Sequence, residues 1–441
     1  MLKWVLWIAI LLMVAACEDL VIEQTASTPA AFPVPNGDRP LEEPLWPEGL
    51  DKETYRDKIL GLLVGSAIGD AMGAPTEMWD RKQIKVQYGY ISTLDPVIRE
   101  GSPEGPWDYN LPQGSTTDDT RWKYLLAKFF SSSGERSDSL DAKAFAKYIV
   151  DIYLAEKADV GQVDGFDPSA LETEIRHMTW LQEWAKVAQP YLNNDINGYS
   201  YALNKFYGGE MSCAGMLYAP MVGAYFPGAP NRAYSEGYKL GLFDLGYARD
   251  ITALTAAYVA KALQPGVSMP QIWELTRTVD PNQYFKSRLV GRIAHNVFLD
   301  AKQISYDAKG IDSSAITPSG QLPANYPYDG LYHARVEKAY ELMDLKLQDI
   351  AFHANEIHLI NLTALIFSEG DFKKALEFVV NYGRDNDTVG AVTGAILGAY
   401  WGESKLPAAW SKQVIETSRE VVGIDLELLA DELVEVAFLE L

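Results

Sequence analysis

The sequence is poor in cysteine and in positive charge. Only Cys17 and Cys213 occur, and two isolated cysteines are too few for a zinc ribbon or a cysteine-ligated iron–sulfur cluster. Lys and Arg number 38 against 60 Asp and Glu, which gives a formal net charge of −22. Such a surface repels phosphate backbones, so we expect no sequence recognition of nucleic acid. Hydrophobic residues make up 48% of the chain, a globular value, so stability is expected from a core rather than from a disulfide.

The first 16 residues have the pattern of an export signal. Lys3 is followed by an apolar run that ends at Val14 and is shorter than the roughly 20 residues that span a membrane. The small residues before Cys17 then resemble the lipobox of bacterial lipoproteins. The resemblance implies that residues 1–16 are removed and that lipidated Cys17 anchors the protein in the cell envelope, on the periplasmic or outer-surface side. An ordinary cleaved signal with an incidental cysteine is the alternative.

The rest of the chain divides into a tether and one large domain. Residues 17–50 contain six prolines, which remove backbone donors and favour extended chain, so no packed element is expected there. Residues 51–441 contain no second low-complexity linker. They exceed the roughly 250–300 residues that one core usually serves, and we expect inserted helices around residues 131–204 to account for the excess.

Helical spacing dominates the predicted domain. Asp371 can cap a helix whose apolar residues recur every three or four positions, and Gly383 can end it. Similar patterns follow Asp119 and cover residues 250–263 and 421–439. Alternating strand patterns are scarce. We therefore predict an all-α fold.

Two segments carry a glycine at every fourth residue. These glycines are Gly61, Gly65, Gly69 and Gly73 in the first segment and Gly390, Gly394 and Gly398 in the second. A glycine inside a helix costs about 1 kcal/mol relative to alanine, so a repeated stripe favours helices whose backbones approach closely. We predict two tightly packed central helices, and packing against each other would use both stripes. Glycines in loops are the alternative.

Three acidic clusters lie beside these segments. They are residues 69–77 with Asp70 and Glu77, residues 115–120 with Asp118 and Asp119, and residues 383–388 with Asp385 and Asp387. Taken singly, each of the last two is explained by capping, because Asp and Thr satisfy free N–H groups at a helix start. Together they supply the carboxylate and hydroxyl oxygens that Mg²⁺ or Mn²⁺ prefers, and a cation would offset the cost of burying several acids. A metal site is therefore a hypothesis beside capping.

The order of the three clusters resembles the ADP-ribosylglycohydrolase family, which includes dinitrogenase-reductase-activating glycohydrolases. The family's Gly-Asp-Ala-x-Gly-x-x-x-Glu stretch is matched by Gly69–Glu77, and its Thr-Asp-Asp-Thr by Thr117–Thr120. Its final Asp-x-Asp-Thr before a glycine-striped helix is matched by Asp385–Thr388. The resemblance implies a compact orthogonal multi-helix bundle that cleaves a ribosyl glycosidic bond with two divalent metal ions, Mg²⁺ or Mn²⁺.

The resemblance also assigns residues to roles. The implied metal ligands are Thr117, Asp118, Asp119, Asp385, Asp387 and Thr388. Glu77 takes the place of the gating or catalytic glutamate and would contact the substrate. Asp119 is expected, in addition, to handle the proton of the attacking water.

The expected substrate pocket departs from the family pattern. Residues 211–220 match the loop Gly-Asn-Gly-Ala-Ala-Met-Arg-x-Ala-Pro, which places Gly215 and Met216 at the substrate, but Leu217 stands where the arginine usually is. His353 and Asn355 are further candidates for the pocket, with a structural histidine as the alternative.

Two functions remain open from the sequence. The first is a metal-dependent glycosidase acting on a small-molecule or ADP-ribosylated substrate. The second is a non-hydrolytic binding module for ADP-ribose or a related nucleotide on the same fold, which the altered loop motivates. Clustered acids favour the enzyme, because a pure binder has no need of them. No feature of the sequence predicts an oligomeric state.

Overall fold

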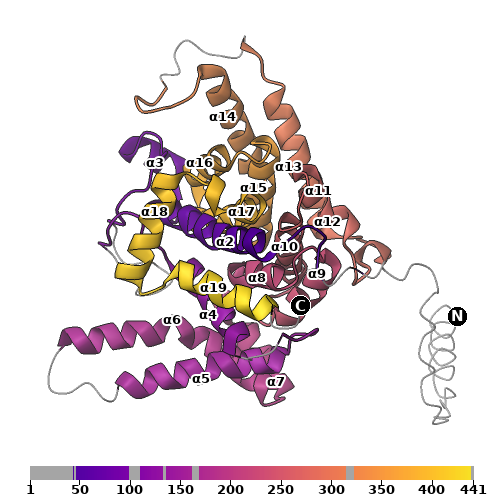
Figure 1. Ribbon diagram of the computed structural model, residues 1–441. Coiled ribbons are helices and arrows are strands. Elements are labelled where there is room, and N and C mark those ends of the chain that lie inside the picture. Colours follow the sequence, from indigo (N-terminus) through magenta and orange to yellow (C-terminus); the bar gives the residue numbers. More distant parts are fainter. Residues whose placement is uncertain are drawn as a thin grey trace, which may run out of the picture. The chain divides into compact units, whose positions relative to one another are not determined.

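The computed structural model describes residues 43, 46–98, 110–132, 136–160, 168–313 and 322–438, with the side chains of residues 159–179 left aside (Figure 1). The predicted signal peptide 1–16, the lipidation candidate Cys17 and most of the tether lie outside the described residues. Glu43–Leu441 belong to one compact unit.

Nearly all described elements are helices. The α-helices are α2 (Lys52–Gly73), α3 (Arg81–Gln87), α4 (Asp118–Ser132), α5 (Ala142–Val160), α6 (Pro168–Leu192), α7 (Ile196–Leu203), α8 (Ala214–Tyr225), α9 (Pro230–Leu240), α10 (Ala248–Ala262), α11 (Met269–Trp273), α12 (Leu275–Thr278), α13 (Ile293–Lys309), α14 (Gly330–Asp344), α15 (Ala354–Phe367), α16 (Phe372–Tyr382), α17 (Asn386–Trp401), α18 (Ala408–Thr417) and α19 (Leu426–Phe438). Short 3₁₀ turns are η1 (Ala74–Thr76), η2 (Phe206–Gly209), η3 (Tyr284–Lys286) and η5 (Glu403–Lys405), and η6 (Ser418–Val422) is a π-helical turn. The described strands, β1 (Trp79–Asp80) and β2 (Gly383–Arg384), form one antiparallel pair. The predicted all-α fold is confirmed.

The two glycine-striped segments form the central helices α2 and α17, which pack antiparallel against each other. Gly61 faces Gly398, Gly65 faces Gly394, and Gly69 faces Gly390. A Cβ added at any of these glycines would lie within 2.5 Å of a backbone atom of the partner helix. The close approach predicted from the stripes is confirmed, and the alternative of glycines in loops is excluded.

Most of the expected helices are present at their predicted positions. α16 is capped by Asp371, whose carboxylate accepts a 3.0 Å hydrogen bond from Lys374 N, and it ends at Gly383 with φ of 85°. The helix expected over 421–439 begins later, at Leu426. Gly423 takes a left-handed conformation after the π-helical turn and separates it from α19.

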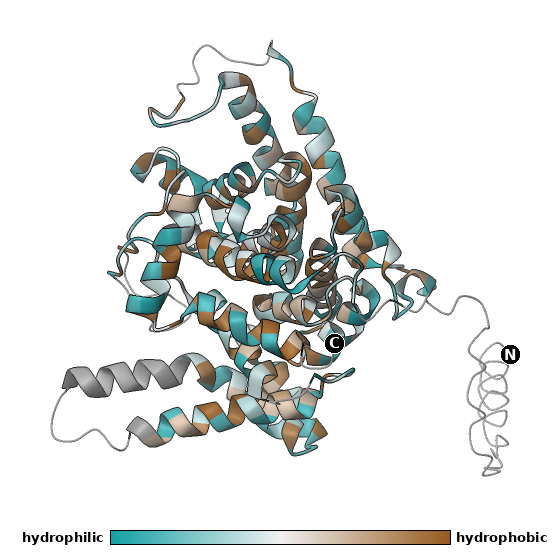
Figure 2. Cartoon of the chain, in the orientation of Figure 1, coloured by the Kyte–Doolittle hydropathy of each residue, from teal (hydrophilic) through white to brown (hydrophobic). Residues whose placement is uncertain are grey.

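Outer helices bury one face only. The buried residues of α19 include Leu426, Leu429 and Leu433, which recur at helical spacing. Figure 2 shows the resulting mixture of hydrophobic and hydrophilic positions along α18 and α19. By length and composition the stretch Lys52–Thr76 could cross a membrane, but its apolar window is entirely buried inside the fold, as expected of a core helix.

Two segments outside the central pair matter for the site. The excess length expected around residues 131–204 forms α5, α6 and α7, with α5 against α6 (Figure 1). The end of the predicted tether packs on the domain, since the Trp46 ring lies 4.9 Å from Tyr55 and 4.8 Å from Phe438.

Candidate functional site

The antiparallel packing of α2 and α17 brings the first and last acidic clusters together. A Cβ on Gly73, at the end of α2, would overlap the backbone of Asp387 at the start of α17. The chain beyond Glu77 continues this contact, because Met78 N donates a 2.7 Å hydrogen bond to Arg384 O and β1 pairs with β2. Residues more than 300 positions apart in sequence therefore form one end of the central pair.

Asp70 positions the middle cluster. Its carboxylate accepts hydrogen bonds from Thr117 N at 2.9 Å, from Thr120 N at 3.1 Å and from Thr120 Oγ1 at 2.6 Å. These donors lie at the start of α4, so Asp70 caps α4 from the neighbouring helix. Burial and the nearby Asp119 raise the pKa of Asp70 to about 7.

Asp119 joins the middle and last clusters. Its Oδ2 accepts a 2.9 Å hydrogen bond from Thr388 Oγ1, and its Oδ1 lies 3.5 Å from Lys123 Nζ. Lys123 is 1% exposed, and Nζ also donates a 3.0 Å hydrogen bond to the Asp119 carbonyl oxygen. Asp119 thus lies beneath the site with both carboxylate oxygens facing polar groups of the protein.

The clusters open onto one pocket with an acidic side and an aromatic side. Its acidic side consists of Glu77, Asp118, Asp385, Asp387 and Thr388, and the remaining lining residues are Trp184, Tyr207, Ser212, Cys213, Ala214, Leu217 and Phe352. The cavity measures about 30 Å³, so a ribosyl group would fill its mouth as well as its interior. Cys213 lies in the wall with Sγ 3.8 Å from Asp385 Oδ2.

The pKa values of the four aspartates in the later clusters are raised. Burial, with help from Asp119 and Glu77, raises the pKa of Asp385 to about 8. Burial and neighbouring carboxylates raise the pKa of Asp118 and of Asp387 well above the ordinary value. Burial also raises the pKa of Asp119, while Lys123 and Thr388 lower it. At neutral pH the metal-free cluster therefore retains protons, which a bound divalent ion would displace.

The oxygen donors of the acidic side match a hard cation in type. Asp387 Oδ1 is buried without a hydrogen-bond partner, and so is Asp119 Oδ1, apart from its ion pair with Lys123. Carboxylate and hydroxyl oxygens dominate the acidic side, as Mg²⁺ or Mn²⁺ requires. Within the part of the chain that the structure describes, however, no three His, Cys, Asp or Glu side chains have the spacing of a formed ion cage. The residues fit a divalent ion in type, and ligation would draw them closer or add threonine and water oxygens.

The remaining predicted substrate residues are not among the lining residues of this pocket, although their chain neighbours Ala214, Leu217 and Phe352 are. Gly215 N donates a 2.9 Å hydrogen bond to Asp244 Oδ1, and Met216 is wholly buried in α8. His353 caps α15, with Nδ1 accepting a 3.1 Å hydrogen bond from Asn355 N. These contacts agree with the alternative that His353 is a structural histidine. Thr117 supports α4 behind the wall. Contact of Gly215, Met216, His353 and Asn355 with a substrate stays a prediction, and so does ligation of a metal ion by Thr117.

The aromatic side was not predicted. Trp184 comes from α6, Tyr207 from the turn η2 and Phe352 from the loop before α15. The Tyr207 ring lies 5.7 Å from Phe352 and 6.5 Å from Trp184, both edge to face. Aromatic residues are too frequent in this chain to single these three out, and their positions have no common spacing.

Arg384 also has a role that the motif did not reveal. It takes a left-handed φ of 66°, and its guanidinium donates to both carboxylate oxygens of Glu356 at 2.7 and 3.0 Å and to Gln348 O at 3.0 Å. These bonds tie the start of α15 and the preceding loop, which carries Phe352, to β2. Asn386, between the two aspartates of the last cluster, donates to Thr76 Oγ1 and to Val380 O, each at 2.9 Å.

Comparison with known proteins identifies relatives of this chain. The profile of the ADP-ribosylglycohydrolase family matches residues 51–440. The chain is 23% identical over 358 residues to protein YegU of Escherichia coli (strain K12), covering 80% of this chain and 90% of that protein. It is 24% identical over 370 residues to the ADP-ribosyl-[dinitrogen reductase] glycohydrolase of Rhodospirillum rubrum, covering 83% and 94%.

A third relative and a solved structure are also similar to this chain. The putative ADP-ribosyl glycohydrolase L543 of Acanthamoeba polyphaga mimivirus is 22% identical over 372 residues, covering 80% of this chain and 89% of that protein. A solved ADP-ribosylglycohydrolase-related protein complex has the same fold, with a TM-score of 0.51 at 18% identity, over 88% of this chain and 100% of the solved one. With the family profile spanning nearly the whole described unit, the chain belongs to the ADP-ribosylglycohydrolase family.

Proposed function

We propose that this protein is a divalent-metal-dependent glycosidase that hydrolyses the bond between a ribose and its leaving group in an ADP-ribosyl or related ribosyl compound. The observation that supports it best is the convergence of Glu77, Asp118, Asp385 and Asp387 on one pocket. A fold alone has no need of four carboxylates in one buried wall, since their mutual repulsion destabilises the folded state.

Two divalent ions, Mg²⁺ or Mn²⁺, would be held by Asp118, Asp119, Asp385, Asp387, Thr388 and Thr117. When bound, they would orient the ribose hydroxyls and lower the pKa of a bound water. The requirement for metal is part of the proposal.

The chain's own groups divide the remaining work. In hydrolysis the oxygen of water forms a bond to the anomeric carbon, the bond to the leaving group breaks, and the water proton passes to a base. Glu77 lines the pocket and is 6% exposed, so it can contact substrate or water directly. Asp119, our predicted base, is not among the lining residues of the pocket. Its hydrogen bond with Thr388 fits a role in orienting Thr388 better than a role as the base.

The aromatic side would hold the planar part of the substrate. Trp184, Tyr207 and Phe352 line the same pocket as the carboxylates, and aromatic rings there would contact a planar group. Leu217 adds an apolar surface where the family has an arginine. Both features favour substrates in which a flat group lies close to the ribose.

The test is a panel of ADP-ribosyl-arginine, ADP-ribosyl-serine, ADP-ribose and simple nucleosides, each with Mg²⁺ or Mn²⁺ and with EDTA. Product should form with metal and not with EDTA, and Asp387→Asn or Asp119→Asn should lose both metal and turnover while remaining folded. Glu377→Gln is the matched control, because Glu377 is buried outside the pocket and bonded to Tyr328 OH at 2.6 Å. Tight binding of a compound without any product would instead favour the non-hydrolytic binding module.

We further propose that the enzyme is exported and anchored through lipidated Cys17, with residues 1–16 removed and residues 17–50 as the tether. The support is the signal-like sequence and the small residues before Cys17. The protein expressed in bacteria should fractionate with membranes and incorporate labelled fatty acid, and Cys17→Ser should lose the label. A labelled Cys17→Ser protein would contradict lipidation at this residue.

A further inference from the structure

A second cavity lies between α3, α14 and the chain at residues 88–90 and 323–326. It measures about 200 Å³, compared with about 30 Å³ at the acidic pocket, and the two share no lining residue. In Figure 1, α3 and α14 lie near α16, and Asn381 of α16 lines the cavity from that side. This cavity has no part in the function proposed above.

The helices present regular faces to the cavity. His333, Val336 and Tyr340 of α14 are spaced by three and four residues and so lie on one side of that helix. On α3, Lys82 and Lys85 are three residues apart and line the opposite side. The geometry is a cleft between two helices, open at the α3 edge where both lysines are exposed.

The charge of the lining is opposite to that of the chain. The charge of Arg81 is offset by its ion pair with Asp344. Lys82 and Lys85 then stand against Glu337, the one carboxylate among the described lining residues, so the sum is 2 − 1 = +1. The whole chain has a net charge of −22. Lys82 and Lys85 form no ion pair with any described side chain. A phosphate has enough oxygens to accept hydrogen bonds from both lysines, so this rim suits a phosphate better than a carboxylate.

Aromatic rings form the interior. The Tyr326 ring lies 4.7 Å from Tyr90 and 5.0 Å from His333, both edge to face. Tyr90 OH donates to Glu377, and Tyr340 OH donates to Phe378 O at 2.6 Å. An apolar cavity of about 150 Å³ accommodates benzene, so this one has room for a single planar ring.

One polar atom in the interior lacks a partner. Tyr326 OH is buried without a hydrogen bond, whereas the hydroxyls of Tyr90 and Tyr340 are satisfied. An unsatisfied buried hydroxyl is costly, and a polar ligand atom that displaced the side chains covering it would relieve that cost. Asn325 holds the Tyr326 segment in place by donating to Tyr88 O at 3.1 Å and Tyr90 O at 2.8 Å.

From these features we propose that the cleft between α3 and α14 binds an aromatic phosphate of the nucleoside monophosphate class. The ring lies among Tyr90, Tyr326 and Tyr340, and the phosphate lies at Lys82 and Lys85. Arg81 also lines the cleft, where it is held by a 2.7 Å ion pair with Asp344 and lies 5.7 Å from the Tyr340 ring.

Calorimetry with AMP, adenosine and inorganic phosphate tests the site. The full-length protein is used with EDTA and in the Asp387→Asn background, so that the acidic pocket contributes nothing. AMP should bind saturably and at least tenfold more tightly than adenosine or phosphate alone. Lys82→Gln/Lys85→Gln should weaken AMP at least tenfold. The matched control is Lys302→Gln/Lys412→Gln, two exposed lysines outside the cleft, which should bind AMP as the unmodified protein does.

A second variant separates the interior from the rim. Tyr326→Phe removes only the unpartnered hydroxyl and should weaken AMP several-fold without lowering the melting temperature. Three results would overturn the proposal: no AMP binding at millimolar concentration, equal binding by the Lys82/Lys85 variant and its control, or loss of binding in the Asp387→Asn background.

Discussion

Thr388 donates a hydrogen bond from Oγ1 to Asp119 Oδ2 over 2.9 Å, which joins the start of α17 to the start of α4. The two residues are 269 positions apart, and both belong to the predicted metal ligands. The bond makes the middle and last clusters one structural unit. A change on either helix is therefore expected to affect both halves of the acidic wall.

The metal-free protein should be more stable at pH 6 than at pH 8. The pKa of Asp385 is raised to about 8 in the folded state, whereas an unfolded Asp titrates near pH ~3.9. Between these values the folded state holds more protons than the unfolded state, so the free energy of unfolding falls as pH rises, by up to about 1.4 kcal/mol per pH unit for each such group. Thermal melts in EDTA at pH 6, 7 and 8 measure this slope.

Asp385→Asn is the control for this prediction, because an amide does not titrate and the slope should become shallower. Saturating Mg²⁺ or Mn²⁺ should remove much of the slope as well, since the ion replaces the protons. Parallel curves for the original protein and Asp385→Asn would show that other groups cause the pH dependence.

Lys123→Met should tighten divalent-metal binding by roughly tenfold or more. The Lys123 ammonium is buried 3.5 Å from Asp119 Oδ1 and repels a cation held by the same carboxylate. Methionine keeps the length of the side chain without the charge. Titration calorimetry of Mn²⁺ into the metal-free protein gives the affinity.

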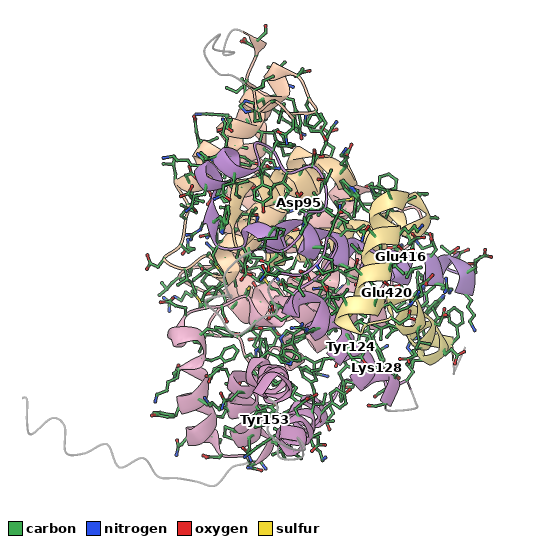
Figure 3. All side chains as sticks on the ribbon, turned by 90° about the vertical axis from the view of Figure 1, so that its left-hand side faces the viewer. Asp95, Tyr124, Lys128, Tyr153, Glu416 and Glu420 are labelled. Atoms are coloured by element: carbon green, nitrogen blue, oxygen red, sulfur yellow. The ribbon has the colours of Figure 1, made fainter. Side chains whose placement is uncertain are left out.

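Lys128→Met is the matched control on the same helix. Figure 3 shows Lys128 beside Tyr124, where it forms a 2.6 Å ion pair with Glu432 outside the acidic pocket. Its metal affinity should be unchanged. Weaker metal binding by Lys123→Met would mean that Lys123 serves mainly to orient Asp119.

Arg384→Gly should destabilise the protein by about 2 kcal/mol although glycine suits the left-handed backbone there. The relief of backbone strain, on the order of 1 kcal/mol, is smaller than the loss from leaving Glu356 buried without its cation. Urea unfolding measures the difference. The double variant Arg384→Gly/Glu356→Gln should recover much of the loss, and an equally unstable double variant would argue against the ion pair as the cause.

Gly69→Ala should cost more than about 2 kcal/mol, because the new Cβ would overlap the carbonyl group of Gly390 and backbone cannot move aside as a side chain does. Gly310→Ala is the control, since Gly310 is exposed and the nearest neighbour of its added Cβ would be Asp307 O at 3.3 Å. Circular dichroism melts compare the two. Similar melting temperatures would contradict the close packing of α2 on α17.

Local patterns in the sequence predicted much of the fold. Asp371 and Gly383 mark the ends of α16, and the glycine stripes indicate the central helix pair. Asp385 and Asp387 could be placed near Glu77 because the stripes bring the ends of α2 and α17 together. Each of these inferences depends on spacing within one element or between two matched elements.

The aromatic side of the pocket could not be predicted, because its residues come from segments that share no motif or spacing. Tyr207 stands in a turn with a left-handed φ of 44°, and Phe352 precedes α15 in a loop. Lys123 did carry a signal, since it lies one helical turn after Asp119, but an i, i+4 pair is commonly a surface feature. Only the structure shows that Lys123 is buried, and this burial distinguishes the Asp119–Lys123 pair from a surface pair.

The glycine contact between α2 and α17 has a mechanical consequence. Backbone lies directly on backbone, so one helix can slide along the other only by a full four-residue step of about 6 Å. The contact between α2 and α17 therefore does not permit small sliding movements. The distance between Glu77, which follows α2, and Asp387, at the start of α17, is expected to stay fixed. Any widening of the mouth to admit a substrate is then expected from the other lining segments, which are α6, η2, the start of α8 and the loop before α15.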